Sequence, residues 1–334
     1  MAKTVEQIAN ALSLSITTVR LVLNGKAEQY RISEKTRQRI TDYVTEHGYT
    51  VNHVARSLKL NKTDTLGLIV PRLSNLFFST LAEKLEMRCH EVGYQLMISC
   101  SYSDPDHENV LVDSLLQRNV DGLFVVPSSV QAMQHHVRTV KRPLVLLDRD
   151  FGAENIPLVI SDNLQGGIVL TQAMLADDAS TPLFFMAGDI HQPAIHDRLR
   201  GYQQSIHDYG LTPCVIEAGH NRREDGILMM QRFFQQHDVP PQAFIASSLP
   251  VLEGILSVIR ERYGYIPAGI NIGTFDEHAM LGFLSNKIWS MRQNEDAWVE
   301  HAFKAMQQAL NREPQPVRAV IPMTLIHRQQ AEHQ

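Results

Sequence analysis

The sequence has no apolar run that approaches the roughly 20 residues needed to cross a membrane as a helix. The residues behind Lys3 also lack the apolar core of a secretion signal, so we expect none here. Cysteine is scarce, with Cys89, Cys100 and Cys214 widely spaced and odd in number. This pattern fits neither a zinc site nor a disulfide framework. Together these features predict a protein of the reducing cytoplasm.

Catalytic signatures are lacking as well. The sequence has no Walker loop, no GxSxG elbow, no HExxH, and no GxGxxG after the first strand expected in its larger part. Neither His135 with His136 nor His191 with His196 has the spacing of metal ligands on a helix. We expect these histidines to be surface or helix-capping residues. The sequence therefore predicts that the chain is not an enzyme and has no metal or cofactor site.

Charge is unevenly distributed along the chain. The formal net charge is −5, but residues 1–62 carry +5 and the remainder carries −10. A small basic end on a larger acidic body is typical of a DNA-binding headpiece joined to a domain that does not touch DNA. A chance variation of surface charge is the alternative explanation of this feature.

Residues 4–24 have the pattern of two short helices joined by a tight turn. Thr4 and Gln7 have the spacing of a capping box, and Ser15 can cap a second helix with Val19 on its inner face. In a helix-turn-helix, the second helix enters the major groove and its N-terminal residues reach base edges. The pattern alone also fits an ordinary pair of helices in any small domain.

Two further segments complete the basic end. Ser33 begins a third helix that stops at Gly48, and basic residues around its start are placed to meet phosphates. The next segment, residues 51–62, can begin a short helix at Asn52 but has too little apolar surface for a core helix. Small apolar side chains beside basic ones suit a hinge helix that folds on DNA and wedges Leu58 into the minor groove. A plain linker explains the pattern equally well.

From residue 63 onward, short apolar runs alternate with helical stretches. About ten strands are expected, among them 65–70, 95–100, 122–126, 143–148, 183–188, 214–219, 243–248, 270–276 and the run RAVIPMTLI. Such alternation predicts an α/β body with parallel sheets covered on both faces. Ten strands are too many for one sheet of this kind, so we expect two doubly wound lobes, about 63–160 and 161–290, with a break at 149–162. Residues 291–334 would cross back to complete both sheets.

Polar and aromatic residues recur at the carboxyl ends of these strands. They are Arg72, Ser74, Asn75, Phe77, Phe78, Ser128, Ser129, Asp148, Arg149, Asp162, residues 191–200, Ser247, Ser248, Asp276, Glu277 and Gln293. In doubly wound folds ligands bind at this end of the strands, and in a two-lobed body these ends face each other across a cleft. Arginines, carboxylates, amides and aromatic rings together suit a sugar. Any single one can equally cap a loop or carry surface charge.

Three consecutive stretches resemble one known family. They are LSLSITTVRLVLN, a third helix that ends in HGY, and NHVARSLKLNKTDTLGLIVP. The chain thereby resembles the lactose-repressor/galactose-repressor (LacI/GalR) family of transcriptional regulators, and its loop GKAEQYRIS resembles the branch of the fructose and sucrose-operon repressors. The resemblance implies a helix-turn-helix headpiece at 1–50, a hinge helix at 51–62 and a two-lobed body of periplasmic-binding-protein type at 63–334. It also implies a cytoplasmic homodimer that a sugar or sugar phosphate releases from a palindromic operator on double-stranded DNA.

The resemblance also implies roles for single residues. Ile16, Thr17 and Leu21 would read bases, and Leu58 of each subunit would part the central base step. The implied DNA contacts are Thr4, Ser15, Ile16, Thr17, Thr18, Arg20, Leu21, Asn24, Tyr30, Arg31, Asn52, Ala55 and Leu58. The implied effector contacts are Asn75, Phe77, Phe78, Ser128, Asp148, Arg149, Asp162, Arg198 in RLRGY, Ser248, Asp276 in GTFDE and Gln293 in MRQNE.

The sequence departs from the family pattern in several places. Ser13-Leu14 replaces the usual Gly-Val, Arg20-Leu21 replaces the frequent Ser-Arg, and Ser248 replaces the Asn of many sugar repressors. Leu21 would meet a thymine methyl group rather than a guanine edge. The effector stays open among fructose, a fructose phosphate and sucrose, because arginines suit a phosphate whereas carboxylates suit bare hydroxyls. A dual activator and repressor of central carbon metabolism and a transport-type sugar-binding protein are the alternative functions.

Overall fold

The computed structural model describes residues 3–49, 62–314 and 318–329. The chain forms two compact units, Met1–Thr63 and Asp64–Gln334. The hinge residues Asn52, Ala55 and Leu58, for which DNA contacts were predicted, lie outside the described residues. No helix among the described residues is long and apolar enough to cross a membrane.

The first unit is a three-helix headpiece. Its helices are α1 (Val5–Leu12), α2 (Ile16–Leu23) and α3 (Glu34–His47). Ile8, Val19 and Ile40, one from each helix, are fully buried and form the centre of its small core. The capping box predicted from Thr4 and Gln7 is present, because each residue's side chain accepts the other's backbone N–H.

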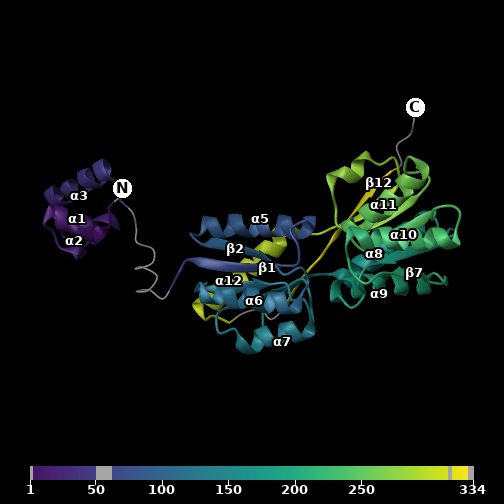
Figure 1. Cartoon of the computed structure of the whole chain (residues 1–334), viewed down its shortest axis with the longest axis horizontal. Coiled ribbons are helices and arrows are strands. Elements are labelled where there is room, and N and C mark those ends of the chain that lie inside the picture. The colour runs from purple at the N-terminus through teal and green to yellow at the C-terminus, as the bar shows by residue number, and fades with distance from the viewer. Residues whose placement is uncertain (1–2, 50–61, 315–317, 330–334) are drawn as a thin grey trace. The chain divides into compact units, whose positions relative to one another are not determined.

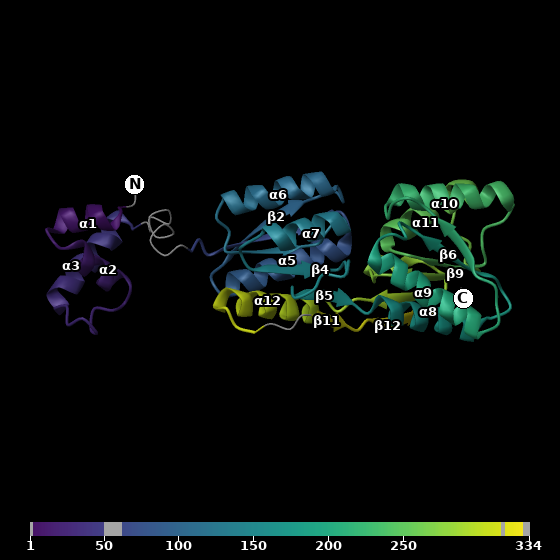
Figure 2. The same ribbon diagram turned by 90° about the horizontal axis from the view of Figure 1, so that it is seen from below.

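The first lobe of the body contains a six-stranded sheet in the order β11-β5-β4-β3-β1-β2, and its strand pairs are parallel (Figures 1 and 2). Its strands are β1 (Thr65–Val70), β2 (Gln95–Cys100), β3 (Gly122–Val125), β4 (Leu144–Leu147), β5 (Leu158–Ser161) and β11 (Arg318–Ile321). Helices α5 (Leu76–Glu91) and α12 (Glu295–Asn311) pack on one face, and α6 (Pro105–Gln117) and α7 (Val130–Thr139) pack on the other.

The second lobe repeats this architecture, with sheet order β12-β10-β9-β8-β6-β7. Its strands are β6 (Leu183–Ala187), β7 (Cys214–Glu217), β8 (Ala243–Ala246), β9 (Asn271–Phe275), β10 (Ile288–Arg292) and the antiparallel β12 (Thr324–Arg328). Helices α8 (Asn163–Asp177) and α9 (Pro193–Asp208) cover one face, and α10 (Arg223–Gln236) and α11 (Leu249–Tyr263) cover the other. A 3₁₀ helix, η1 (Ala279–Phe283), precedes β10.

The chain crosses between the lobes three times, after β5, after β10 and after β11. The predicted alternation and the return of the C-terminal segment are confirmed, but three details were wrong. The expected break at 149–162 contains β5, β10 was not predicted, and RAVIPMTLI forms two strands in different sheets, separated at Pro322. Proline lacks the N–H that a continuous strand would need there, so the chain leaves one sheet and enters the other.

Two pairs of glycines let helices of the second lobe pack backbone to backbone. A Cβ on Gly201 of α9 would lie 2.4 Å from the Leu164 carbonyl oxygen of α8, and one on Gly167 would lie 2.5 Å from the Arg198 carbonyl oxygen. Gly226 and Gly254 join α10 to α11 in the same way. These contacts leave no room for a side chain, so they fix the helix starts that face the first lobe.

Candidate effector cleft and DNA-reading surface

The outer surface of the headpiece presents the start of α2. Ile16 is 42% exposed, Thr17 and Arg20 are exposed, and Leu21 is half-buried. An exposed isoleucine in a domain with so small a core is the kind of apolar side chain that can contact thymine methyl groups. This surface has the composition of a DNA-reading helix.

Several other residues predicted to contact DNA also cap or end helices within the headpiece. The Thr18 N–H donates to Ser15 Oγ at 3.0 Å, so both residues form the N-terminal cap of α2. Asn24 ends the same helix, and Tyr30 and Arg31 are exposed on the loop before α3. Arg39, one of the basic residues around the start of α3, donates to the Leu12 carbonyl oxygen at 3.0 Å and so secures the end of α1.

The turn between α1 and α2 contains a residue in an unfavourable conformation. Ser13 has φ 54° and ψ 42°, the left-handed region that favours glycine. We predict that Ser13→Gly raises the free energy of unfolding of the headpiece by about 0.5–1 kcal/mol, because glycine occupies this region without the steric cost. Thermal denaturation followed by circular dichroism checks this, with Ser15→Gly, which removes a cap, expected to lower the midpoint. An unchanged or lower midpoint in Ser13→Gly would contradict the prediction.

In the body, strand ends of both lobes converge on an inner pocket of about 60 Å³. Nine predicted effector residues line it: Asn75, Phe77, Phe78, Asp148, Arg149, Arg198, Ser248, Asp276 and Gln293. Asn75, Phe77 and Phe78 come from the start of α5 in the first lobe, whereas Arg198 and Ser248 come from the second. The pocket therefore has an aromatic side and a charged side, as a sugar requires.

Arg198 is the most firmly held cation of this pocket. Its side chain is 4% exposed, donates through Nε to Asn163 Oδ1 and through Nη1 to the Ser247 carbonyl oxygen, both at 2.8 Å, and lies 4.4 Å from the ring centre of Phe275. Burial lowers the pKa of Arg198, and the charges of Asp276 and Asp148 oppose that shift. The guanidinium is thus preorganised, with carboxylates close enough to share a hydroxyl-bearing ligand.

Asp148 and Arg149 form the corresponding charged group of the first lobe. Asp148 follows β4 with φ 65° and is 8% exposed, and burial raises the pKa of its carboxyl group. Arg149 Nε lies 4.0 Å from that carboxylate, and its Nη1 donates to the Pro127 carbonyl oxygen at 3.0 Å. A buried carboxylate of raised pKa is poorly solvated, so it gains by accepting hydrogen bonds from the hydroxyl groups of a ligand.

A hydrogen-bonded chain connects the pocket to two of the three crossings. Gln293 Nε2 donates to Asp276 Oδ1 at 2.5 Å, and Gln293 Oε1 accepts from Ser161 Oγ at 2.5 Å. Ser161 in turn accepts from Trp298 Nε1 at 2.9 Å. Ser161 ends β5, Gln293 follows β10 and Trp298 lies in α12, so these bonds link a carboxylate that lines the pocket to the segments where the chain crosses between the lobes.

Two residues predicted to contact the effector have other partners. The Ser128 hydroxyl donates to Glu108 inside the first lobe, and Glu108 also lies 2.8 Å from His136 Nε2. Asp162 caps α8 by accepting from the Gln165 N–H at 3.1 Å. Neither residue lines the inner pocket or the larger cavity beside it. His136 is fully buried, so the prediction that it lies on the surface or caps a helix was wrong.

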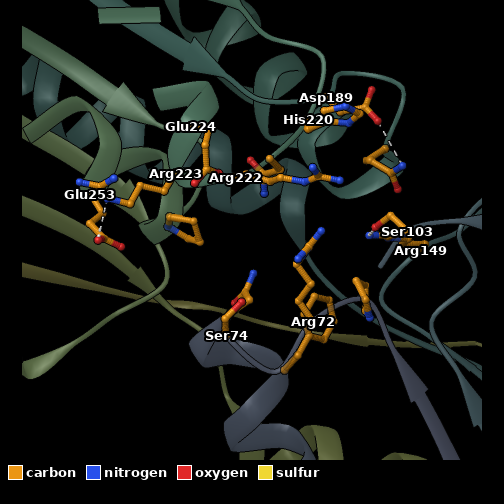
Figure 3. Close-up of a pocket in the computed structure, with 16 residues that line it drawn as sticks. Arg72, Ser74, Ser103, Arg149, Asp189, His220, Arg222, Arg223, Glu224 and Glu253 are labelled. Atoms are coloured by element: carbon orange, nitrogen blue, oxygen red, sulfur yellow. Dashed lines mark hydrogen bonds and ion pairs between the residues drawn. The ribbon is translucent and has the colours of Figure 1, made fainter. Parts of the chain in front are cut away.

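The larger cavity lies between the lobes and has a volume of about 360 Å³ (Figure 3). Arg72, Arg149, Arg222 and Arg223 line it, together with Ser74, Ser103, Asp189, His220, Asn221, Glu224 and Glu253. Among these residues, Arg72, Ser74 and Arg149 were predicted from their positions after strands, whereas Arg222 was not, because it lies five residues beyond the end of β7. Among the described residues no cluster of three His, Cys, Asp or Glu side chains could hold a metal ion.

Comparison with known proteins identifies the fold family. Residues 63–286 match the model of the periplasmic binding proteins and sugar binding domain of LacI family. The chain belongs to the LacI family. The three-helix headpiece precedes the part of the chain that matches this model. The predicted resemblance is therefore confirmed.

Two LacI-family relatives are similar over nearly the whole chain. The chain is 29% identical to the sucrose operon repressor of Klebsiella pneumoniae, with 96% of this chain and 97% of that protein aligned. It is 30% identical to the catabolite repressor/activator of Salmonella typhimurium, with 93% and 94% aligned. Both relatives are transcriptional regulators rather than enzymes.

Solved structures show the same fold. The Cra transcriptional dual regulator from Pseudomonas putida in complex with fructose 1-phosphate aligns with a TM-score of 0.73 at 22% identity, over 81% of this chain and 100% of that one. The lac repressor dimer bound to operator and the anti-inducer ONPF aligns with a TM-score of 0.84 at 17% identity, over 98% of both chains. The LacI-family architecture thus extends to the headpiece as well as the body.

Proposed function

We propose that this LacI-family chain is a homodimeric, cytoplasmic repressor of a sucrose- or fructose-utilisation operon, released from a palindromic operator by a sugar or sugar phosphate. The observation that carries the proposal is the inner pocket, in which Arg198, Asp148, Asp276 and Gln293 are buried and preorganised between two lobes. A ligand rich in hydroxyl groups suits this combination of a guanidinium, carboxylates and an amide. The headpiece supplies the second binding site that a regulator needs.

Release follows from linkage between the two binding sites. A ligand that contacts Asp148 in one lobe and Arg198 in the other binds better when the lobes are closed, so it shifts the body toward closure. The chain crosses three times between the lobes, which restricts this movement to a rotation about the crossings. Closure in turn changes the spacing of the two headpieces on DNA. Coupling of about 1–3 kcal/mol is typical of such systems.

A second candidate function is a dual regulator of central carbon metabolism. The similarity to a catabolite repressor/activator favours it. In that case the same effector site would control operators at which the bound protein raises transcription as well as operators at which it lowers transcription. The two functions share one protein–DNA equilibrium and differ in the position of the operator.

Fluorescence anisotropy tests the proposal. The purified chain is titrated onto labelled DNA from upstream of its own gene and its neighbours, at fixed salt because salt alone changes such affinities by orders of magnitude. Fructose, fructose 1-phosphate and sucrose are then added separately. We expect tight specific binding and release by one of the three. Specific binding that none of them releases would overturn the sugar assignment, and binding no tighter than to random duplex would overturn the regulator assignment for these sites.

A further inference from the structure

Two arginines face each other across the larger cavity from opposite lobes. Arg72 follows β1 in the first lobe, and Arg222 immediately precedes α10 in the second. Both line the cavity and both are half-buried. Figure 3 shows the Arg72 side chain directed from the first lobe toward Arg222. The cleft therefore brings together two like charges that belong to different lobes.

Three other charged residues of this cavity, Arg149, Arg223 and Asp189, have hydrogen-bond or ion-pair partners. Arg223 Nε lies 2.9 Å from Glu253 Oε1, and Arg149 donates to the Pro127 carbonyl oxygen and to Ser103. Asp189 accepts from Gln192 Nε2 at 3.2 Å and from the His191 N–H. Within the described ranges 3–49, 62–314 and 318–329, no carboxylate lies within 4.0 Å of the guanidinium nitrogens of Arg72 or Arg222, and Glu224, which also lines the cavity, is exposed. Neither guanidinium therefore forms a direct ion pair within these described ranges.

Both arginines are held in place by neighbouring residues. The Arg72 guanidinium lies 5.1 Å from the ring centre of Tyr102, which leaves the edge of the guanidinium directed at the cavity. The loop before α10 is fixed by Asp225, whose carboxylate accepts the backbone N–H groups of His220 and Arg222 at 3.2 and 3.1 Å. A loop tied in this way presents its arginine without a large loss of entropy on binding.

We propose that Arg72 and Arg222 form a clamp for the phosphate group of a phosphorylated sugar, with the sugar ring in the inner pocket. The clamp, which rests on the proposed sugar-responsive function, extends that function to an anionic effector. One phosphate offers oxygens to two guanidinium groups at once and turns their repulsion into attraction. Closure of the lobes is then driven by the phosphate, while Arg198, Asp148 and Asp276 recognise the hydroxyls.

Calorimetric titration of the full chain with fructose 1-phosphate, fructose and inorganic phosphate tests the clamp. We expect Arg72→Ala and Arg222→Ala each to weaken fructose 1-phosphate binding by about 10- to 100-fold, because each removes one charge-assisted contact. Fructose binding should stay within about twofold. The double variant should lose less than the product of the single losses, since one phosphate couples the two residues. Arg200→Ala is the matched control, because Arg200 is exposed, pairs with Asp197 and lies outside both cavities.

Several results would overturn the clamp. Equal losses of fructose and fructose 1-phosphate affinity in the two variants would show that the arginines support the fold rather than bind phosphate. Wild-type protein that binds neither fructose 1-phosphate nor inorganic phosphate would exclude a phosphate site. Tighter binding of inorganic phosphate than of fructose 1-phosphate would reject a sugar-linked effector. Operator binding is measured separately by anisotropy, so failure of the repressor proposal is distinguished from failure of the clamp.

A charge reversal tests the geometry without any ligand. Arg72→Glu places a carboxylate opposite Arg222 and should close the cleft of the unliganded chain, which small-angle X-ray scattering detects as a smaller radius of gyration than that of wild type. Arg72→Glu with Arg222→Glu restores two like charges and should restore the wild-type value. A radius of gyration that is the same in all three proteins would contradict the facing arrangement of these side chains.

Discussion

Replacing Arg198 with alanine is expected to abolish release by the effector while leaving operator binding unchanged. Arg198 is buried among Asn163, Ser247 and Phe275, and it shares its surroundings with the carboxylates of Asp276 and Asp148. Truncation removes the cation and leaves carboxylates unpaired beside the ligand. Loss of one partner of a buried charged contact costs about 3 kcal/mol, which corresponds to more than a 100-fold rise in the effector dissociation constant.

Anisotropy titrations measure the operator affinity and the effector concentration for half-release in the same sample. Arg198→Lys should raise the effector concentration for half-release almost as much as Arg198→Ala. A single ammonium group cannot bind Asn163 Oδ1, the Ser247 carbonyl oxygen and a ligand in one plane. Arg200→Ala, two residues further along α9 and exposed, should behave as wild type. An Arg198→Ala variant that loses operator affinity to the same extent as effector response would argue against two separate sites.

Replacing Asp148 with asparagine should have opposite effects on stability and on function. Burial raises the pKa of Asp148, so the ionised carboxylate is destabilised in the unliganded pocket. Asparagine keeps the shape without the charge, and the melting temperature of the unliganded protein should therefore rise. Effector affinity should fall by about 10- to 100-fold, because hydrogen bonds from ligand hydroxyls to a charged acceptor are stronger than those to a neutral one. Scanning calorimetry with and without fructose 1-phosphate measures both effects.

The same substitution has a defined pH dependence. Because the folded-state pKa of Asp148 is raised above its unfolded value, protonation favours the fold, and this contribution is complete below the unfolded pKa and lost as pH rises through the folded pKa. The stability advantage of Asp148→Asn should thus be smallest at low pH and grow as pH rises through the folded pKa. Denaturant unfolding of both proteins between about pH 4 and pH 8 checks this. An advantage that is constant, or that is largest at the acidic end, would contradict it.

The strands of the body show which elements of a fold can be predicted from a sequence. Long buried strands such as Thr65–Val70 were predicted because each is a continuous apolar run between helices. Leu158–Ser161 was missed because its four residues follow a turn-rich segment, and Ile288–Arg292 because polar residues interrupt its apolar pattern. Both short strands are specified by their neighbours in the sheet rather than by their own composition.

The candidate site shows a similar limit. Position after a strand predicts that a residue lies at the cleft edge of the sheet, but not where its side chain points. Ser128 turns inward to Glu108, a partner 20 residues away that no local pattern indicates. Arg222 reaches the cavity because the loop before α10 returns across the strand ends, and the path of a loop is set by contacts such as those of Asp225.

Neither lobe is continuous in the sequence, and this governs the order in which the nascent chain can fold. The core of the first lobe needs Trp298 and Phe303 of α12 as well as Ile321 of β11, which the ribosome supplies only after the whole second lobe has been made. The headpiece core needs no residue beyond Tyr49, just after α3, and can form as soon as that residue emerges. During synthesis the helices of the headpiece can therefore fold long before the effector cleft is complete. An incomplete chain has a folded headpiece but no effector site that could control it.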